Sequence, residues 1–342
     1  MVEKNLDFRS DTVTWPSPEM RQAAANALVG DMGYGEDPSV NELESLAAEM
    51  LGKEAGLYVT SGSQGNAVAM LTQTNKGDEF IAEERSHIYS MEKGHWAMIG
   101  SLAPRLIKGV EGWLPTEEIR ANVRGNPNEG FRTSLLCLEN THLSSGGTAI
   151  PVEKMREDYE VSKELGLNMH LDGARIFNAS IALGVDVKRI AKYTDTVQFC
   201  LSKGLAAPVG SVVVGSHEVI ERAKSYRRIL GGGMRQAGII AAPGVVALKS
   251  MVDRLQEDHD NAQYLGIELE KMGFRLVFPV KTNMVFIDPT SVGWTGEQWV
   301  EVCAKYGFKT MVRNKTRIRL VTHYGIERED LETLVEGIST HI

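Results

Sequence analysis

The chain of 342 residues carries a net charge of −8 at pH 7, and 42% of its residues are hydrophobic while 24% are charged. This composition is that of a globular protein, and it excludes an intrinsically disordered or fibrous chain. The acidic balance argues against a surface that binds duplex nucleic acid, because phosphate neutralisation needs clustered Lys and Arg. The length predicts about two domains.

The cysteines and the hydropathy pattern indicate the cellular compartment of the protein. Cys137, Cys200 and Cys303 are widely spaced within apolar runs, so we expect buried free thiols and neither a disulfide framework nor a zinc site. The N-terminus has no apolar signal core, and no stretch reaches the roughly 18 apolar residues of a membrane span. We therefore expect a cytoplasmic protein that makes no membrane contact.

Helical and strand-like segments alternate along the first 250 residues. Ser17-Pro18 and Asp37-Pro38 predict two helix starts, since each pair places a capping side chain before a proline at the first helical position. The predicted strands cover residues 57–60, 79–82, 134–138, 168–171, 196–201 and 211–214, and the helices between them include 66–71 and 155–165. This alternation indicates βαβ units and a mostly parallel sheet.

The last 90 or so residues change in character, and the order of predicted helices and strands there is typical of an α+β unit. We expect a long charged helix over 251–272, strands over 275–278, 284–287, 308–312 and 318–321, a helix over 296–306 and a last helix after Arg328. The sequence therefore predicts a large domain over residues 1–250, including an N-terminal arm, and a small domain over 251–342.

Polar residues follow several predicted strands, where α/β sheets bind their ligands. Gly62 and Ser63 lie between the strand 57–60 and a helix, where free backbone N–H groups form an anion site, although an ordinary Gly-rich turn has the same composition. Asp172 and Arg175 follow another strand. They are either an internal ion pair, or an acid for a cationic ring nitrogen and an arginine for an anion.

Two further clusters are basic. Lys203 follows the strand 196–201; lysines are ordinarily solvated surface residues, but the apolar flank favours a nucleophile that forms a Schiff base. Arg228 and Arg235 flank three consecutive glycines, which suits an anionic group or a solvated basic turn. A Schiff-base lysine, an acid for a pyridinium nitrogen, a phosphate cradle and arginines are together the requirements of pyridoxal phosphate.

The sequence also resembles the low-specificity L-threonine aldolases, in the β-eliminating-lyase branch of the fold-type-I pyridoxal phosphate enzymes. The resemblance runs almost from end to end. Its strongest motifs are Phe8–Thr14, Tyr34–Pro38, Glu139–His142, His170–Arg175, Leu201–Gly204, Gly231–Gln236 and Arg319–His323. It implies an α/β fold of the fold-type-I transferase kind with a smaller C-terminal α+β domain. It also implies a homotetramer, a dimer of dimers whose active sites are shared between subunits.

The resemblance implies roles for the cofactor-binding residues, with pyridoxal 5'-phosphate as the cofactor. Lys203 matches the lysine that holds the cofactor covalently, Asp172 matches the acid paired with the pyridine nitrogen, and His87 matches the histidine that stacks on the ring. The remaining cofactor-binding positions are Gly62 and Ser63 at the phosphate, Arg175 beside the ring, Arg235 as a further phosphate ligand and Arg228 from a neighbouring subunit.

The resemblance also implies the substrate-binding residues. Ser10 and Arg319 match the clamp on the substrate carboxylate, with Arg175 beside it, and Tyr34 matches a tyrosine given across the dimer interface. A bidentate arginine suits a carboxylate. The implied reaction is the retro-aldol cleavage of L-threonine or L-allo-threonine to glycine and acetaldehyde.

Two positions depart from the family pattern. The loop 126–132 has no histidine, with Glu129 near the expected place, and Leu143 stands where relatives often have Asn. Both fall in the region that contacts the β-hydroxyl and the substrate side chain. They leave open which group is the catalytic base and which diastereomer is preferred. They also leave open whether the protein is an aldolase that prefers phenylserine, or catalyses another reaction such as β-elimination or transamination.

Two other classes of protein fit less well. A non-catalytic scaffold that binds pyridoxal phosphate would not need both Lys203 and Asp172. A metal-dependent aldolase is disfavoured because the eight histidines show neither HxxxH nor HxH spacing, and we expect no metal ion.

Overall fold

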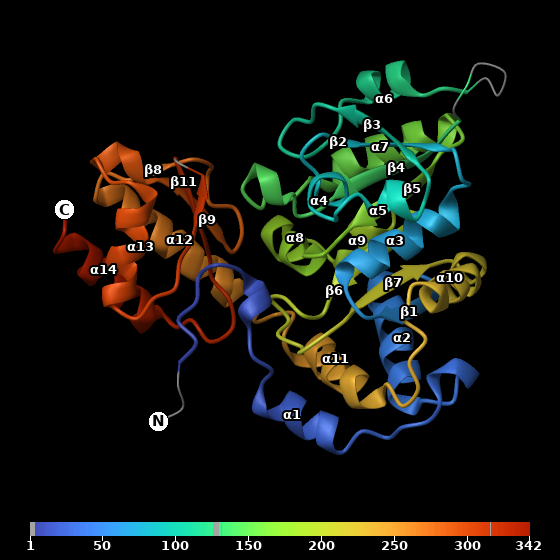
Figure 1. Ribbon diagram of the computed structural model, residues 1–342, viewed down its shortest axis with the longest axis horizontal. Helices are drawn as coiled ribbons and strands as arrows, with labels where there is room; N and C mark the ends of the chain where they lie inside the picture. Colours follow the sequence, from blue (N-terminus) through green and yellow to red (C-terminus); the bar gives the residue numbers. More distant parts are fainter. Residues whose placement is uncertain (1–3, 126–129, 131, 315) are drawn as a thin grey trace.

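The computed structural model describes residues 4–125, 130, 132–314 and 316–342, which form two units, each with its own sheet (Figure 1). The larger sheet has the strand order β1-β7-β6-β5-β4-β2-β3. Only β7 runs antiparallel to its neighbours. Its strands are β1 (Ala55–Val59), β2 (Glu79–Glu83), β3 (Ala103–Ile107), β4 (Thr133–Glu139), β5 (Asn168–Asp172), β6 (Thr196–Cys200) and β7 (Ser211–Gly215). The predicted α/β class with a mostly parallel sheet is confirmed.

Helices cover both faces of this sheet, which is why its strands are apolar on both sides. In β1, Leu57 and Val59 pack with α3 and α10, while Tyr58 points into the core on the opposite face. One face carries α3 (Gly62–Gln73) and α10 (His217–Ile229). The opposite face carries α2 (Pro38–Leu51), α7 (Val152–Glu164), α8 (Ile176–Leu183), α9 (Val187–Ala191) and α11 (Gly238–Ser250).

Shorter helices connect these elements. They are α1 (Pro18–Ala25), α4 (His87–Ser90), α5 (His95–Met98) and α6 (Thr116–Asn122). The helix starts predicted at Ser17 and Asp37 are confirmed, since each side chain accepts a hydrogen bond from a backbone N–H of the first turn. None of the described helices is both long enough and apolar enough to cross a membrane.

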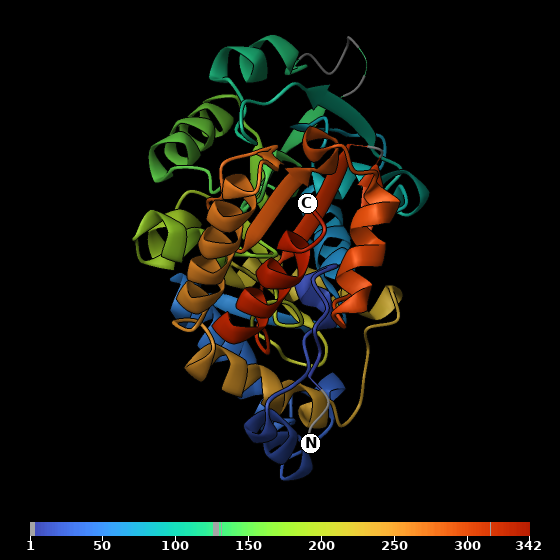
Figure 2. The same cartoon turned by 90° about the vertical axis from the view of Figure 1, so that its left-hand side faces the viewer.

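The second unit is a four-stranded antiparallel sheet in the order β10-β11-β9-β8. Its strands are β8 (Arg275–Leu276), β9 (Met284–Asp288), β10 (Val312–Asn314) and β11 (Arg317–Val321). Helices α12 (Leu255–Lys271), α13 (Gly296–Lys305) and α14 (Arg328–Ser339) cover one face and lie in front of the strands in Figure 2. Trp299, Leu320 and Leu334 are fully buried between them.

The N-terminal arm packs with this second unit. Phe8 is fully buried in its core, and the Phe8 N–H donates to the Lys309 carbonyl at 2.8 Å. The expected strand over 308–312 is therefore wrong: Lys309 pairs with the arm, and β10 begins only at Val312. The boundary near residue 250 stays a prediction.

Candidate active site

Parallel strands of the large sheet end at one edge, and four of the predicted cofactor-binding residues follow or end these strands. Asp172 is the last residue of β5, and Lys203 follows β6, the neighbouring strand. His87 begins α4 after β2, and Gly62 begins α3 after β1. This edge is where ligands bind in α/β sheets.

Asp172 is 2% exposed, and each of its carboxylate oxygens accepts one hydrogen bond. Its Oδ2 accepts from Asn66 Nδ2 at 2.9 Å, and its Oδ1 accepts from the Ala174 N–H at 3.1 Å. A side-chain atom of Asp172 lies within 4.8 Å of one from His87 and one from Glu92. The structure therefore brings together the predicted ring-nitrogen acid and the predicted stacking histidine.

The start of α3 offers backbone N–H donors for an anion. Ser61 caps the helix by accepting from the Gln64 N–H, while the N–H groups of Gly62 and Ser63 have no partner inside the helix. A side chain at Gly62 would clash, because its Cβ would lie 2.9 Å from Cys200 Sγ. The helix was predicted to begin at 66, but it begins four residues earlier, at Gly62, because Ser61 caps it.

Arg175 is buried and is held by Asp11, a residue that the sequence analysis quoted without assigning it a role. Arg175 Nε donates to Asp11 Oδ2 at 2.7 Å, and Nη2 donates to Oδ1 at 2.6 Å. Burial alone would raise the pKa of the Asp11 carboxyl, but the Arg175 guanidinium, with Lys203 and Arg319, holds that pKa well below its usual range. One carboxylate thus lies among three cations.

Arg319 reaches this cluster from the second unit. On β11, Ile318 and Leu320 face the core of that unit, so Arg319 points the other way. Its Nη2 donates to the Arg9 carbonyl at 2.7 Å, whereas its buried Nε has no partner among the described residues. Burial, with the nearby guanidinium groups of Arg313 and Arg175, lowers the pKa of Arg319 to about 9. The site has an unsatisfied cation ready for an anion.

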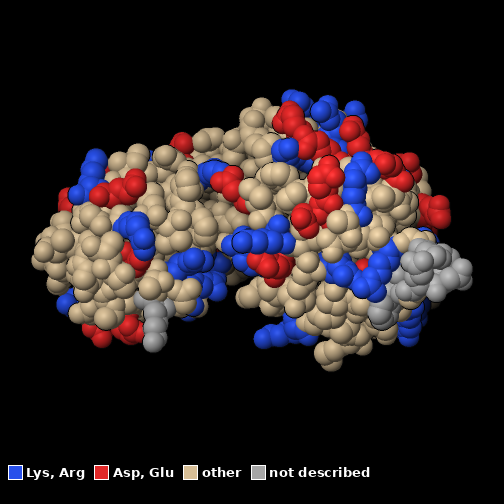
Figure 3. Space-filling view, turned by 90° about the horizontal axis from the view of Figure 1, so that it is seen from above, with Lys and Arg blue, Asp and Glu red and all other residues tan. Residues whose placement is uncertain are grey.

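The other half of the predicted carboxylate clamp is close by in the chain. Ser10 caps the short 3₁₀ turn Asp11–Val13, and its hydroxyl lies 3.4 Å from Asp11 Oδ1. Seen from above, the surface is indented between the two units, and Lys and Arg side chains border the indentation (Figure 3). Three of the predicted substrate-binding residues thus come from the first unit (Arg175), the second unit (Arg319) and the N-terminal arm (Ser10).

Two carboxylates hold His87, one through its ring and one through its backbone. Its Nδ1 lies 2.9 Å from Glu92 Oε1, and its backbone N–H donates to Glu139 Oε2 at 2.6 Å. Burial disfavours the charged imidazole, yet the hydrogen bond to Glu92 and the charges of Asp172 and Glu139 outweigh it and raise the pKa of His87. Glu92 was not predicted, because it belongs to none of the quoted motifs and its contact with Asn66 spans 26 residues.

Glu139 and His142 belong to one of the motifs of the family resemblance but were not predicted as site residues. Glu139 Oε1 accepts from the Leu143 N–H at 2.8 Å, so this carboxylate links the segments of His87 and Leu143. His142 is fully buried, and its Nε2 lies 3.2 Å from Glu83 Oε2. Burial lowers the pKa of His142, but Glu139 and Glu83 outweigh burial and raise it overall. Together these residues hold the loop after β4 against the loop after β2.

Three predicted residues lie elsewhere. Tyr34, Arg228 and Arg235 line a separate surface cavity of about 450 Å³. Tyr34 is 80% exposed, and Arg235 Nη1 lies 3.6 Å from Asp31 Oδ2. Within one chain the structure does not bring these residues to Asp172. Glu129 lies outside the described residues.

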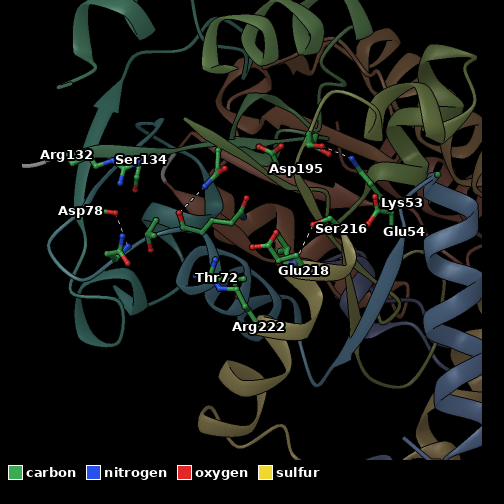
Figure 4. Close-up of a pocket in the computed structure, with 18 residues that line it drawn as sticks. Lys53, Glu54, Thr72, Asp78, Arg132, Ser134, Asp195, Ser216, Glu218 and Arg222 are labelled. Carbon is green, nitrogen blue, oxygen red and sulfur yellow. Dashed lines mark hydrogen bonds between the residues drawn. The ribbon is translucent and has the colours of Figure 1, made fainter. Parts of the chain in front are cut away.

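A larger cavity, of about 620 Å³, lies at the other edge of the sheet (Figure 4). It is lined by Ser134 and Asn168, at the starts of β4 and β5, by Asp195 before β6, and by Lys53 and Arg222. These are the amino ends of the strands, so this cavity is distinct from the site around Asp172. None of the site residues predicted from the sequence is among the described residues that line this cavity.

The residues around Asp172 fit pyridoxal phosphate. A buried carboxylate supplies a partner for a pyridine nitrogen, the α3 N-terminus supplies N–H groups for a phosphate, and the unpartnered Arg319 Nε supplies a donor for a carboxylate. Lys203 follows the strand next to Asp172, and its charge acts on Asp11.

Comparisons with known proteins agree with this geometry. The model of the beta-eliminating lyases matches residues 7–291. Low-specificity L-threonine aldolase 1 of Arabidopsis thaliana is 44% identical over 338 residues, covering 97% of this chain and 94% of that protein. The low specificity L-threonine aldolase of Escherichia coli K12 is 42% identical over 329 residues, covering 95% of this chain and 96% of its own.

Solved structures share the fold. The threonine aldolase of Leishmania major superposes with a TM-score of 0.83 at 20% identity, covering 98% of this chain and 99% of that one. With a family match over most of its length and curated relatives above 40% identity, this chain belongs to the beta-eliminating lyase family.

Proposed function

We propose that this protein is a pyridoxal-phosphate-dependent aldehyde-lyase that cleaves L-threonine, L-allo-threonine or a related L-β-hydroxy-α-amino acid to glycine and an aldehyde. The observation that carries the proposal is the convergence of Asp172, the Lys203 loop and the α3 N-terminus at one edge of the sheet. The names of the relatives from Arabidopsis and Escherichia coli support the substrate class.

The cofactor-binding roles follow from the contacts of each residue. Lys203 would bind pyridoxal phosphate covalently, Asp172 would keep its ring nitrogen protonated, and the N–H groups of Gly62 and Ser63 would hold its phosphate. His87, oriented by Glu92, would present the flat face of its ring to the cofactor. When bound, pyridoxal phosphate supplies an electron sink for the pair released from the Cα–Cβ bond.

The substrate-binding roles rest on the cation cluster. Arg319 would bind the amino-acid carboxylate through its free Nε and an Nη group, with Ser10 as a further donor. Asp11 keeps Arg175 in place beside it. Fixing the carboxylate orients the Cα–Cβ bond for cleavage, so these contacts act on the rate as well as on binding.

We also propose a homotetramer, a dimer of dimers in which subunits share active sites. Tyr34, Arg228 and Arg235 lie together on the surface of one chain, away from its own Asp172. A two-fold axis that brings this surface to the site of a second copy would place the arginines at its cofactor phosphate.

Aldehyde release from purified protein supplied with pyridoxal phosphate tests the proposed function. The panel is L-threonine, L-allo-threonine, both phenylserine diastereomers and L-serine, with Lys203→Ala as the control. We expect rapid acetaldehyde release from the two threonines and none from Lys203→Ala. Protein that binds pyridoxal phosphate but forms no glycine from any of these substrates would contradict the proposal; pyruvate without aldehyde would indicate β-elimination.

One observation favours a preference for phenylserine as a second candidate. Leu143 packs with Met284, Phe286 and Val321 in an apolar cluster between the two units, close in the chain to Glu139 and hence to His87. An apolar wall here suits a phenyl substituent better than the methyl group of threonine. Release of benzaldehyde without acetaldehyde in the same panel would support this candidate.

A further inference from the structure

A buried polar network lies beneath the candidate site, between α3 and strands β5 and β6. His170 and Asp172 are two residues apart on β5, so their side chains leave the sheet on the same face. Asn66 lies on α3, which packs on that face. The exposed fractions of Asn66, His170 and Asp172 are 1%, 0% and 2%, so water does not compete for their hydrogen bonds.

The amide of Asn66 joins two carboxylates. Its Nδ2 donates to Asp172 Oδ2 at 2.9 Å and to Glu92 Oε1 at 2.8 Å. Both N–H bonds of the amide are thus used, and both acceptors are acids that contribute to the candidate site. Because a carboxylate only accepts, the nitrogen must face the acids and Oδ1 must face away from them.

His170 fixes that orientation. Its Nε2 lies 3.1 Å from Asn66 Oδ1, and its Nδ1 lies 2.8 Å from Thr196 Oγ1. Burial lowers the pKa of His170 to about 4, so the ring is neutral at neutral pH, with one donor and one acceptor. Nε2 therefore donates to Asn66, and Nδ1 accepts from the Thr196 hydroxyl.

The far end of the network is anchored by the same helix. Gln73 Nε2 donates to Thr196 Oγ1 at 2.7 Å. Gln73 follows Asn66 by seven residues, about two helical turns, so both side chains lie on one face of α3. Thr196 is the register partner of His170 on β6. The strand register and the helix periodicity together place the side chains that form this series of hydrogen bonds from Gln73 to Asp172.

We propose that Asn66 is a positioning residue that aims Asp172 at the pyridine nitrogen of the cofactor and bridges Asp172 to Glu92, with His170 holding the Asn66 amide in the required orientation. This inference rests on the proposed function, since it concerns the partner of bound pyridoxal phosphate. Without Asn66, two buried carboxylates would face each other without their shared donor. One of them would then turn away or take up a proton.

Asn66→Ala tests the role of the amide, and Asn261→Ala is the matched control. Asn261 is also a buried amide within a helix, but it donates to the Ile326 carbonyl in the second unit. The readouts are the dissociation constant of pyridoxal phosphate, the absorbance spectrum of the bound cofactor, and kcat and KM for L-threonine.

For Asn66→Ala we expect cofactor binding weakened by roughly tenfold to a hundredfold, the loss that follows when a hydrogen bond to a charged group is removed. We expect a shifted absorbance band and a fall in kcat larger than the rise in KM, because Asp172 acts on the reacting ring and not on substrate binding. If Asn66 had only a structural role, Asn66→Ala would lower the thermal stability but leave the spectrum and kcat/KM unchanged.

His170→Phe provides a second variant, which keeps a ring in the same place but removes the donor to Asn66. Circular dichroism shows whether each variant folds. The same spectral shift in folded His170→Phe, in smaller measure, would support the inference. Spectra and cofactor affinities of both variants equal to those of Asn261→Ala would overturn it while leaving the proposed function intact, whereas wild-type protein that does not bind pyridoxal phosphate would overturn both.

Discussion

The buried guanidinium of Arg319 has a donor that the described residues leave unsatisfied, and no carboxylate is paired with it directly. Such a cation costs free energy unless an anion arrives. We therefore expect Arg319→Ala to lower kcat/KM roughly a hundredfold, with KM raised and kcat lowered, since losing a buried charged hydrogen-bond partner costs about 3 kcal/mol.

Steady-state kinetics with L-threonine check this expectation. Arg275→Ala is the control, because Arg275 is an exposed arginine of the same unit that pairs with Asp288. Kinetics of Arg319→Ala that match this control would remove Arg319 from the substrate-binding residues.

Two substitutions of His87 test whether its ring stacks on the cofactor or transfers a proton. Phenylalanine keeps a flat ring but has no nitrogen, whereas asparagine keeps polar atoms but no ring. If His87 stacks on the cofactor, His87→Phe retains severalfold more kcat/KM than His87→Asn. Measured kcat/KM values that fall equally in the two variants would instead indicate that His87 moves a proton.

Helix α7 contains a buried acid outside the site. Asp158 is fully buried, and neither side-chain oxygen has a partner among the described residues. Burial raises the pKa of Asp158 to about 8. The folded protein therefore binds a proton that the unfolded chain releases near its ordinary pKa of 3.8, and wild-type stability falls as pH rises from about 4 to 8.

Asp158→Asn removes this titration. We expect the variant to exceed the wild type in free energy of unfolding at pH 8.5, by on the order of 5 kcal/mol, with little difference near pH 4. Urea unfolding at both pH values measures this, with Glu160→Gln, an exposed acid of the same helix, as the control. A difference between Asp158→Asn and wild type that does not grow with pH would contradict the assignment.

Elements with local signals could be predicted from the sequence, and contacts between distant segments could not. Ser17-Pro18 and Asp37-Pro38 predict the starts of α1 and α2. By contrast, the bond between Arg175 and Asp11 spans 164 residues, and no periodicity marks Asp11. Asp172 could be placed at a strand end, but its partner Asn66 could not be found without the packing of α3 on β5.

At the scale of the whole molecule, the arm explains why the site needs both units. Residues near Phe8 pair with the second unit, and a few residues later Asp11 holds Arg175 of the first. Arg319 bonds to the backbone of the same arm at Arg9. The chain length predicted two domains but gave no sign that the N-terminal arm would pack with the C-terminal one.

The surface group of Tyr34, Arg228 and Arg235 leads to a prediction about assembly. If Arg228 serves the site of a second copy, each site takes Lys203 from one subunit and Arg228 from the other. Lys203→Ala and Arg228→Ala then each remove the contribution of a different subunit. A mixed dimer then contains one site with both residues intact and one with neither. Random pairing of equal amounts makes half of the dimers mixed, so co-expression of the two variants recovers about a quarter of wild-type activity.

Aldehyde release from the co-expressed variants, beside each variant alone, measures this recovery, and light scattering establishes the oligomeric state. Lys203→Ala co-expressed with Arg319→Ala is the control, because both residues belong to one chain's site and a mixed dimer then holds no complete site. Activity from the first pair and not from the second would place Arg228 across the interface. No recovery from either pair would assign Arg228 to its own chain's site, and the separation between Tyr34 and Asp172 would then need a rearrangement within one subunit.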